Sequence, residues 1–303
     1  MPPQEPWTVL RLINWTKEYF EKNQVESSRL SAEVLLAHSL KCQRIQLYTR
    51  FDYVPSADET ATFKGLVQRA VKHEPIAYLV GTKEFYSLPF RVTEDVLIPR
   101  QETELLVAQA IEHLQKLGSP GAVWDCCTGS GCVAVAVAAR VKDCRVLATD
   151  ISPAAVVVAA ENAQRNQVSD RVTTAVADLL TLPKNVDLPA GVNGTDGDGA
   201  VSRTFDVITA NPPYIVEGGE VSPEVKHEPA LALYAGNTGL ELIRRVIADG
   251  PALLREGGVL IMEFGYDQAD AVRDLLVAGG AFQEPRILRD HQEIERAAVA
   301  RKR

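Results

Sequence analysis

Residues 122–150, AVWDCCTGSGCVAVAVAARVKDCRVLATD, decide the fold class of this chain. A short apolar run over 122–126 leads into a turn with two glycines, and an apolar stretch then continues to Arg140. A second short run, 145–149, ends at Asp150. Short apolar runs bounded by turns predict buried strands, and the longer apolar stretch between them predicts a helix. A strand, a helix and a strand in this order are the unit from which parallel sheets are built.

Strands and helices continue to alternate from this unit to the C-terminus. The last two expected strands have no helix between them, so they are predicted to form an antiparallel hairpin at the edge of the sheet. The whole pattern predicts an α/β fold with a doubly wound, mostly parallel, seven-stranded sheet of the Rossmann-like kind. The further strands are expected at 171–177, 205–210, 258–264, 283–289 and 296–301, and the further helices at 153–166, 238–255 and 267–278.

The part of the chain before the sheet reads as a separate helical region. Val9 and Ile13 belong to an apolar series with helical spacing, and Pro75 ends the last helix of this region. Residues 76–99 are rich in aromatic and β-branched side chains, which predicts a β-hairpin, and a helix is expected over 101–117. We therefore expect three parts, which are a helical bundle (1–74), a linker with a hairpin and a helix (75–119) and the sheet domain (120–303).

The charge of the chain argues against a nucleic-acid partner. The 303 residues include 32 basic and 40 acidic side chains, which gives a formal net charge of −8. Residues 1–74 carry ten basic and nine acidic side chains, so the acidic excess lies in the remainder. Direct binding of nucleic acid needs a basic face and is therefore not expected. The chain shows neither a signal-peptide pattern nor an apolar run long enough to span a membrane, so a cytoplasmic protein without membrane contact is expected.

Neither the cysteines nor the segment 183–203, which is rich in Gly, Asp and Pro, predicts a metal site. The cysteines are odd in number and lack the spacing of zinc ligands, so we expect buried thiols rather than a metal site or a disulfide framework. Residues 183–203, PKNVDLPAGVNGTDGDGAVSR, are predicted to form a surface loop. The DGDG at 196–199 supplies too few ligands for an EF-hand calcium site. The cysteines are Cys42, Cys126, Cys127, Cys132 and Cys144.

Glycine or carboxylate residues follow the first three expected strands of the sheet. Ligands of open α/β sheets bind at the carboxyl ends of the strands. In the first segment, DCCTGSG (125–131), the glycines let the backbone approach a ligand, and the following helix offers free N–H groups. The carboxylate of Asp150 can accept hydrogen bonds from a ribose diol, and that of Asp178 from an adenine amino group. The loop differs from G-x-G-x-x-G, so a dinucleotide is less favoured than another adenosine cofactor but stays open.

The fourth expected strand ends in the most specific motif, Asn211-Pro212-Pro213-Tyr214. The prolines fix φ and lack N–H groups, so the backbone presents its carbonyl oxygens rigidly. The Asn211 side chain adds another carbonyl oxygen, and Tyr214 adds an aromatic face and a hydroxyl. This arrangement predicts a site for a planar group that carries an NH₂, and it contains no strong base, nucleophile or metal ligand.

The order of these motifs resembles that of class I S-adenosylmethionine-dependent methyltransferases. The NPPY segment resembles the motif of enzymes that methylate amide or exocyclic amino nitrogens. Four longer segments resemble those of the peptide chain release factor N5-glutamine methyltransferase family, which would make the chain a protein-(glutamine-N5) methyltransferase. They are PIAYLVGTKEFYSLPF (75–90), LIPRQETELLV (97–107), TANPPYI (209–215) and HEPALALYAGNTGLELIRRVI (227–247).

The resemblance implies a substrate, a cofactor and a role for each site residue. The substrate would be the glutamine of the Gly-Gly-Gln motif in release factors, and the helical bundle would recognise this protein partner. S-adenosyl-L-methionine would supply the methyl group and leave as S-adenosyl-L-homocysteine. Asn211 and Pro212 would accept the two N–H bonds of the substrate amide, while Pro213, Tyr214 and Phe85 would line its pocket, with Asn211, Pro212 and Tyr214 as the catalytic residues. Cofactor contacts are implied at Cys127, Thr128, Gly129, Ser130, Gly131, Asp150, Asp178, Leu179 and Asn211.

Two residues depart from the family pattern. Cys127 stands where the family loop has its first glycine, and a side chain is accommodated there only if its φ is negative. Gln101 stands where the family often has proline, which affects the start of a helix rather than the chemistry.

Four alternatives stay open. A ribosomal-protein glutamine N5-methyltransferase shares NPPY. The resemblance implies that this second family lacks the segment that residues 98–104 supply here. A DNA adenine N6-methyltransferase would need a basic surface that the acidic sheet domain does not offer. A module that holds an adenosine cofactor without turnover would have no use for the convergent acceptors of NPPY. An NAD oxidoreductase is the remaining enzyme class.

Overall fold

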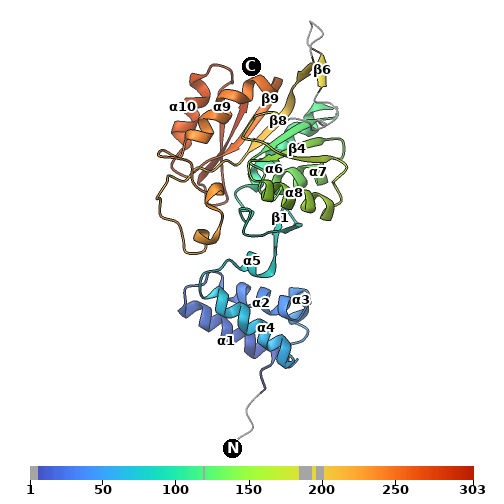
Figure 1. The fold of residues 1–303 in the computed structure, drawn as a ribbon, viewed down its shortest axis with the longest axis vertical. Coiled ribbons are helices and arrows are strands. Elements are labelled where there is room, and N and C mark those ends of the chain that lie inside the picture. The colour runs from blue at the N-terminus through green and yellow to red at the C-terminus, as the bar shows by residue number, and fades with distance from the viewer. Residues whose placement is uncertain (1–5, 119, 184–192, 196–200) are drawn as a thin grey trace, which may run out of the picture. The chain divides into compact units, whose positions relative to one another are not determined.

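The computed structural model describes residues 6–118, 120–183, 193–195 and 201–303. The chain divides into two compact units (Figure 1). The first consists of the residues up to Thr82 together with Val221–His227, and the second of Lys83–Glu220 and Glu228–Arg303. Each unit has an apolar core of its own, so the two are described one at a time.

The first unit is the expected helical bundle. Its core consists of apolar side chains at helical spacing, among them Val9, Ile13 and Phe20, all 1% exposed or less. Residues 76–80 are helical rather than extended, because Leu79 packs into this core and Gly81 ends the turn in the left-handed conformation at φ +71°. The helices are α1 (Val9–Lys22), α2 (Ser28–Ser39), α3 (Arg44–Leu47), α4 (Ala57–Ala70) and α5 (Ile76–Val80).

The second unit contains the predicted sheet of seven strands. Its order is β10-β11-β9-β8-β3-β4-β5, with parallel pairing from β9 through β5 and antiparallel pairing of β10 and β11 at one edge. The doubly wound fold and the terminal hairpin are therefore confirmed. The strands are β3 (Ala122–Cys126), β4 (Arg145–Asp150), β5 (Val172–Val176), β8 (Phe205–Ala210), β9 (Leu254–Glu263), β10 (Arg286–Arg289) and β11 (Glu295–Arg301).

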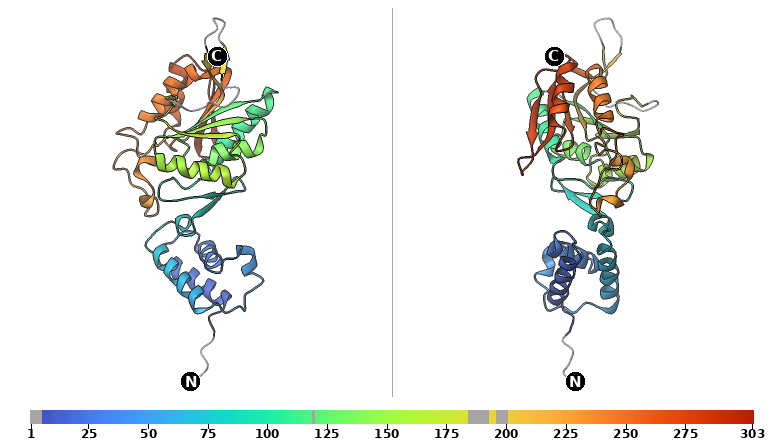
Figure 2. Two further views of the ribbon diagram at one scale, coloured as in Figure 1. Left: turned by 45° about the vertical axis from the view of Figure 1, so that its right-hand side comes forward. Right: turned by 90° about the vertical axis from the view of Figure 1, so that its left-hand side faces the viewer.

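Helices cover both faces of this sheet because its strands are apolar on both sides (Figures 1 and 2). Val123 and Val146 pack toward one face, while the next residue of each strand packs into the cluster on the other. Trp124, fully buried in that second cluster, donates from Nε1 to Thr149 Oγ1 at 2.8 Å. Helices α6 (Glu104–Leu117), α7 (Cys132–Arg140) and α8 (Pro153–Arg165) cover the first face, and α9 (Glu241–Leu253) and α10 (Ala269–Ala278) the second.

The expected linker is not a separate part of the chain. Helix α6 contributes Leu106 and Val107 to the core beneath the sheet. The hairpin of β1 (Thr82–Phe85) and β2 (Leu88–Arg91) is fixed to α8, where the Asn162 side chain exchanges hydrogen bonds of 2.7 and 2.9 Å with the backbone of Arg91. The boundary between the units therefore falls at residues 82 and 83 rather than on either side of a linker.

A segment that follows the NPPY motif belongs to the helical unit. Residues 221–227 include the short 3-10 helix η1 (Val225–His227); a second one, η2 (Ala230–Ala232), follows in the sheet unit. Within the helical unit, Glu224 Oε1 lies 2.8 Å from His73 Nδ1. The sequence gives no sign of this association, because it joins residues 151 positions apart.

The segment 183–203 is only partly described. Strands β6 (Asn193–Thr195) and β7 (Val201–Arg203) pair antiparallel, so these residues form short strands rather than the expected surface loop. Strands of three residues are too short to show an alternating pattern in the sequence. The DGDG at 196–199 lies outside the described residues.

Candidate functional site

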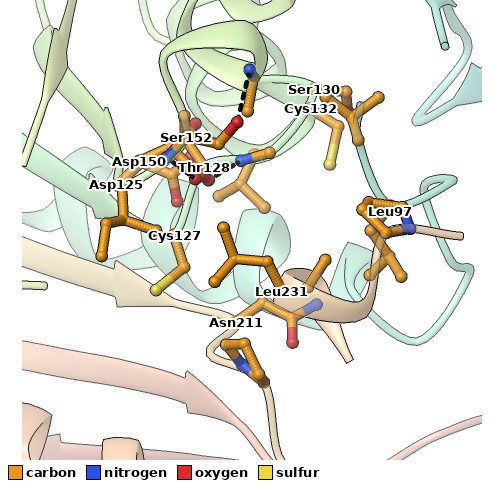
Figure 3. A pocket seen from close by; sticks show the side chains of 18 of the residues that line it. Leu97, Asp125, Cys127, Thr128, Ser130, Cys132, Asp150, Ser152, Asn211 and Leu231 are labelled. Carbon is orange, nitrogen blue, oxygen red and sulfur yellow. Dashed lines mark hydrogen bonds between the residues drawn. The ribbon is translucent and has the colours of Figure 1, made fainter. Parts of the chain in front are cut away.

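A cavity of about 270 Å³ lies at the carboxyl ends of the parallel strands. Strand β3 stands between β4 and β8, so the connections after β3 and β8 lead to opposite faces of the sheet. Such a change of direction opens a crevice, which is where α/β sheets bind ligands. Figure 3 shows side chains from the glycine loop, from β4 and from the end of β8 around this cavity.

The glycine loop is held by Asp125, a buried carboxylate on β3. Asp125 accepts hydrogen bonds from Thr128 Oγ1 at 2.5 Å, from Thr209 Oγ1 at 2.7 Å and from the N–H of Ala134 at 3.2 Å. Burial raises the pKa of this carboxyl to about 6, against the three hydrogen bonds. Its contacts join the loop to α7 and to β8. No separate role was expected for Asp125, although a carboxylate inside an apolar strand indicates a buried polar group that needs partners.

Cys127 has a positive φ of +57°, so the expectation of a negative φ is wrong. The turn between β3 and α7 requires the left-handed conformation there, because the next N–H, of Thr128, bonds back to Thr149 O at 2.9 Å. Gly131, at φ +78°, is needed for packing, since a Cβ on it would lie 3.0 Å from Ala159 Cβ. Gly129 is different. A Cβ on it would meet no atom within 4 Å, which leaves this part of the loop open.

Asp150 faces the cavity at the end of β4 (Figure 3). Its two carboxylate oxygens accept the N–H groups of Gly129 at 2.9 Å and Ser152 at 3.0 Å. Burial raises its pKa, opposed by these backbone hydrogen bonds. Each oxygen keeps a second lone pair, so the carboxylate both fixes the glycine loop and can accept from a ligand hydroxyl. Ser152 takes the capping role at the start of α8, where its Oγ accepts from Ala155 N at 3.2 Å.

Asp178 and Leu179 also line the cavity, after β5. Asp178 Oδ2 lies 2.8 Å from Arg245 Nη2, and both side chains are about half exposed. This pair is solvated, so it contributes little to stability. Leu179 is buried and has a positive φ of +47°. Leucine is uncommon in that conformation, and Cys127 and Leu179 therefore place two unusual backbone conformations at one cavity.

The NPPY segment meets the cavity through Asn211 and Pro213. Asn211 Nδ2 donates to Thr103 Oγ1 at 3.2 Å, and Thr103 Oγ1 donates to Glu263 Oε2 at 2.7 Å. Tyr214 donates to the other oxygen of Glu263 at 3.4 Å, and its pKa is raised, chiefly by burial. Pro212 and Tyr214 are not among the residues that line the cavity. Sequence reasoning did not find Thr103 or Glu263.

Phe85 does not lie at this cavity, contrary to its expected place in the substrate pocket. It is 3% exposed and packs edge-on against Phe90, with ring centroids 6.0 Å apart. Both rings belong to the core on the side of α6 and α7. The physical reason is that the β1–β2 hairpin uses its aromatic side chains to attach itself to the sheet unit.

A wall of the cavity comes from two segments far apart in sequence. Leu97 and Leu231 line it, the first from the residues before α6 and the second from η2. Glu228, 5% exposed, connects these segments, because it accepts the N–H of Ile98 at 3.0 Å and pairs with the guanidinium of Arg100. Both segments resemble those of the family, but neither sequence shows that the two segments contact each other.

Among the residues that the structure describes, no three His, Cys, Asp or Glu side chains gather closely enough to hold a metal ion. Over the same residues, no helix is long and apolar enough to cross a membrane.

Comparison with known proteins identifies the family. The family model of the PrmC N-terminal domain matches residues 11–81, and that of the ribosomal protein L11 methyltransferase matches residues 100–211. A release factor glutamine methyltransferase of Rhodopirellula baltica is 41% identical over 292 residues, which is 94% of this chain and 93% of that protein. The chain belongs to the release factor glutamine methyltransferase family.

Other relatives agree with this assignment. The release factor glutamine methyltransferase of Chlorobaculum tepidum is 37% identical over 303 residues, covering 98% of each chain. Among solved structures, the hMettl16 catalytic domain has a TM-score of 0.53 at 15% identity and covers 71% of this chain and 76% of that one. A likeness at this identity shows the methyltransferase fold and nothing more. The chain is thus a methyltransferase, and the expectation of an enzyme of this family is confirmed.

Proposed function

We propose that this enzyme transfers a methyl group from S-adenosyl-L-methionine to the side-chain amide nitrogen of the glutamine in the Gly-Gly-Gln motif of peptide chain release factors. The observation that carries the proposal is the orientation of Asn211 at the cavity. Its Nδ2 is used by Thr103, so the carbonyl oxygen of the same side chain is free to accept an N–H of a substrate amide.

The residues of the cavity fit S-adenosyl-L-methionine. The open side of Gly129 gives room for close approach to the loop backbone. Ser130 Oγ is buried at the cavity without a hydrogen-bond partner among the described residues, and a ligand can supply one. Asp150 would hold the ribose hydroxyls, and Asp178 and Leu179 would contact the adenine. The sulfonium group of this cofactor makes its methyl group electrophilic.

Orientation supplies the catalysis in this proposal. An amide nitrogen is a weak nucleophile because its lone pair is delocalised into the carbonyl. The Asn211 side-chain oxygen and the Pro212 carbonyl would accept its two N–H bonds and aim the nitrogen at the methyl group. The N–C bond forms as the S–C bond of the cofactor breaks, and the same two acceptors stabilise the positive charge that the nitrogen gains. S-adenosyl-L-homocysteine leaves, and the methylated nitrogen releases one proton to water. Pro213 would pack against one side of the substrate amide. Tyr214 would hold this segment in place through its hydrogen bond with Glu263.

The helical unit is proposed to dock the release factor. Residues 1–74 are nearly neutral, with ten basic and nine acidic side chains, whereas the rest of the chain carries the acidic excess. The unit presents an exposed aromatic stripe, in which Trp15 stacks on Tyr19 with centroids 5.1 Å apart and meets Trp7 edge-on at 6.1 Å. Trp7 and Trp15 are 43% and 47% exposed. Exposed aromatic side chains are enriched at protein interfaces.

The experiment is a transfer assay with labelled S-adenosyl-L-methionine. Two protein substrates are compared: a release factor and the same release factor with its Gly-Gly-Gln glutamine replaced by asparagine. We expect label on the first and none on the second. A ribosomal protein preparation serves as a third substrate, and label there without label on the release factor would favour the ribosomal alternative instead.

A further inference from the structure

Glu263 is a buried carboxylate whose place next to NPPY needs an explanation. It is the last residue of β9 and is 2% exposed. In the described part of the chain, no lysine, arginine or histidine forms a salt bridge with it. Its hydrogen-bond partners are the hydroxyls of Thr103 and Tyr214. A buried charge without a cation is costly, so a purely structural role would be served better by an apolar side chain.

The hydrogen bonds from Glu263 to Asn211 have one direction when Glu263 is ionised. A carboxylate only accepts, so the Thr103 hydroxyl must give its hydrogen to Glu263 Oε2, 2.7 Å away. The oxygen of Thr103 can then only accept, and it accepts from Asn211 Nδ2 at 3.2 Å. Asn211 is thereby held with its NH₂ toward Thr103 and its carbonyl oxygen available to the cavity that it lines.

We propose that Glu263, acting through Thr103, is the positioning residue that sets which end of the Asn211 amide faces the substrate. The inference rests on the proposed function, since only a substrate with N–H groups needs the carbonyl end. When Glu263 is protonated, it can donate to Thr103, and the Thr103 hydroxyl can then donate to Asn211. The amide would turn over and present its NH₂ to the substrate NH₂, two donors facing each other.

The surroundings of Glu263 allow this change of protonation near neutral pH. Burial raises its pKa to about 7; the Thr103 hydrogen bond lowers it, the charge of Glu102 raises it, and Tyr214 and Arg296 lower it. Burial and the charge of Glu263 both raise the pKa of the Cys132 thiol on α7, so Glu263 and this thiol interact electrostatically. Methyl transfer is therefore expected to decline as the pH falls through about 7, because the fraction of Glu263 that is ionised falls.

The test compares kcat for release factor methylation with cofactor affinity in three variants. Glu263→Gln can donate from its amide and imitates the protonated state, and Thr103→Val removes the hydroxyl at nearly constant shape. Both should lower kcat on the order of 10²-fold, as misplacement of a reacting group does. Thr103→Ser keeps the hydroxyl and should keep most of the activity. Calorimetric titration should show that all of them still bind S-adenosyl-L-methionine.

The pH profile separates positioning from a merely structural role. Wild-type kcat should fall on the acid side of about pH 7, and the profile of Glu263→Gln should be flat there. If Glu263→Gln does not fold, the pH profile of the wild-type kcat and the kcat of Thr103→Val still test the inference. A flat wild-type profile, or Thr103→Val with wild-type kcat, would overturn the inference. A wild-type enzyme that labels no release factor would instead remove the proposed function itself, so the two failures are distinguishable.

Discussion

Cys127 shows how much a single residue of the loop can depart from the family pattern. The resemblance led us to expect glycine at this position, and the backbone here has a left-handed φ of +57°, which glycine adopts freely. A cysteine in that conformation is strained on the order of 1–2 kcal/mol. The fold tolerates this because the flanking hydrogen bonds, such as that from Thr128 N to Thr149 O, fix the turn.

The strain at Cys127 predicts the order of stability among its variants. Cys127→Gly should match the wild type or exceed it by up to about 1 kcal/mol, because relief of strain is partly offset by the greater freedom of glycine in the unfolded chain. Cys127→Val should lose about 1–2 kcal/mol, since a β-branched side chain fits this φ worst. Cys127→Ala, which has a Cβ like cysteine, is the control. Urea unfolding measures all three, and a valine variant as stable as the alanine variant would disprove the strain.

The sequence predicted which residues lie at the cavity where a single motif supplies them. It did not predict contacts between residues that are distant in sequence. Asp150 and Asn211 could be placed at the cavity because each ends an apolar strand. Thr103 and Glu263 could not, since they lie 108 residues before and 52 residues after Asn211 and meet it only through the sheet. The expected place of Phe85 in the substrate pocket was wrong, because an aromatic residue in a hairpin can pack into the core as readily as it can bind a ligand.

At the scale of elements, the close approach of α7 and α8 positions the glycine loop. Gly131 begins α7, and its backbone lies against Ala159 of α8. Asn162 of α8 donates to Ser130 O at 2.9 Å and thereby holds the loop from the same side. The geometry of the cofactor loop thus depends on how two helices pack, as well as on the residues of the loop itself.

This packing predicts different effects for two glycine substitutions in one loop. Gly131→Ala would place a Cβ 3.0 Å from Ala159 Cβ and 3.1 Å from its Cα, at φ +78°, so it should cost about 2–4 kcal/mol and weaken cofactor binding. Gly129→Ala has a positive φ of +52° but no neighbour within 4 Å, so strain alone should cost about 1–2 kcal/mol. Denaturant unfolding compares the two. Equal losses would show that the contact with α8 does not matter.

Element types could be predicted where the apolar pattern is long and regular. The alternation of strands and helices from residue 122 onward gave the seven strands, including the terminal hairpin. Short elements were not predicted, because α5 has five residues and β6 and β7 have three each, too few for an apolar pattern to recur. These elements form because their neighbours pair with them or bury them.

At the scale of the whole molecule, residues 221–227 join the helical unit although they follow the NPPY motif in sequence. The expected division into bundle, linker and sheet domain assumed that each part is continuous in sequence. Contacts such as His73 with Glu224 are not visible to a pattern read along the chain. The charge balance disfavours a nucleic-acid partner, and that expectation stays a prediction.

The proposed docking surface predicts a KM effect without a kcat effect. Trp15→Ala should raise the KM for the release factor several-fold and leave kcat and the Kd for S-adenosyl-L-methionine unchanged, because the stripe lies outside the catalytic unit. The matched control is Ile45→Ala, which removes a side chain that is 66% exposed on α3 of the same unit. Equal KM values for the two variants would exclude the stripe from docking.

Buried carboxylates predict the pH dependence of stability. Asp125 and Glu263 have pKa values raised to about 6 and about 7, from ordinary values of 3.8 and 4.5. At these two sites the folded chain keeps protons that the unfolded chain has released, so their contribution to the free energy of unfolding should fall as the pH rises from about 4 to about 7. Glu263→Gln should reduce this fall, and Glu256→Gln, an exposed residue of the same strand, should not. Urea unfolding across this range measures it, and an unchanged slope in Glu263→Gln would contradict the assignment.

The site of the methyl group on the product tests the proposed reaction directly. A release factor is incubated with S-adenosyl-L-methionine and either the wild-type enzyme or Asn211→Ala, and the Gly-Gly-Gln peptide is fragmented in a mass spectrometer. We expect the wild-type enzyme to add one methyl group to the glutamine side-chain amide. We expect Asn211→Ala to add none at comparable times while still binding the cofactor. A methyl group on any other residue, or an Asn211→Ala enzyme that methylates at the wild-type rate, would contradict it.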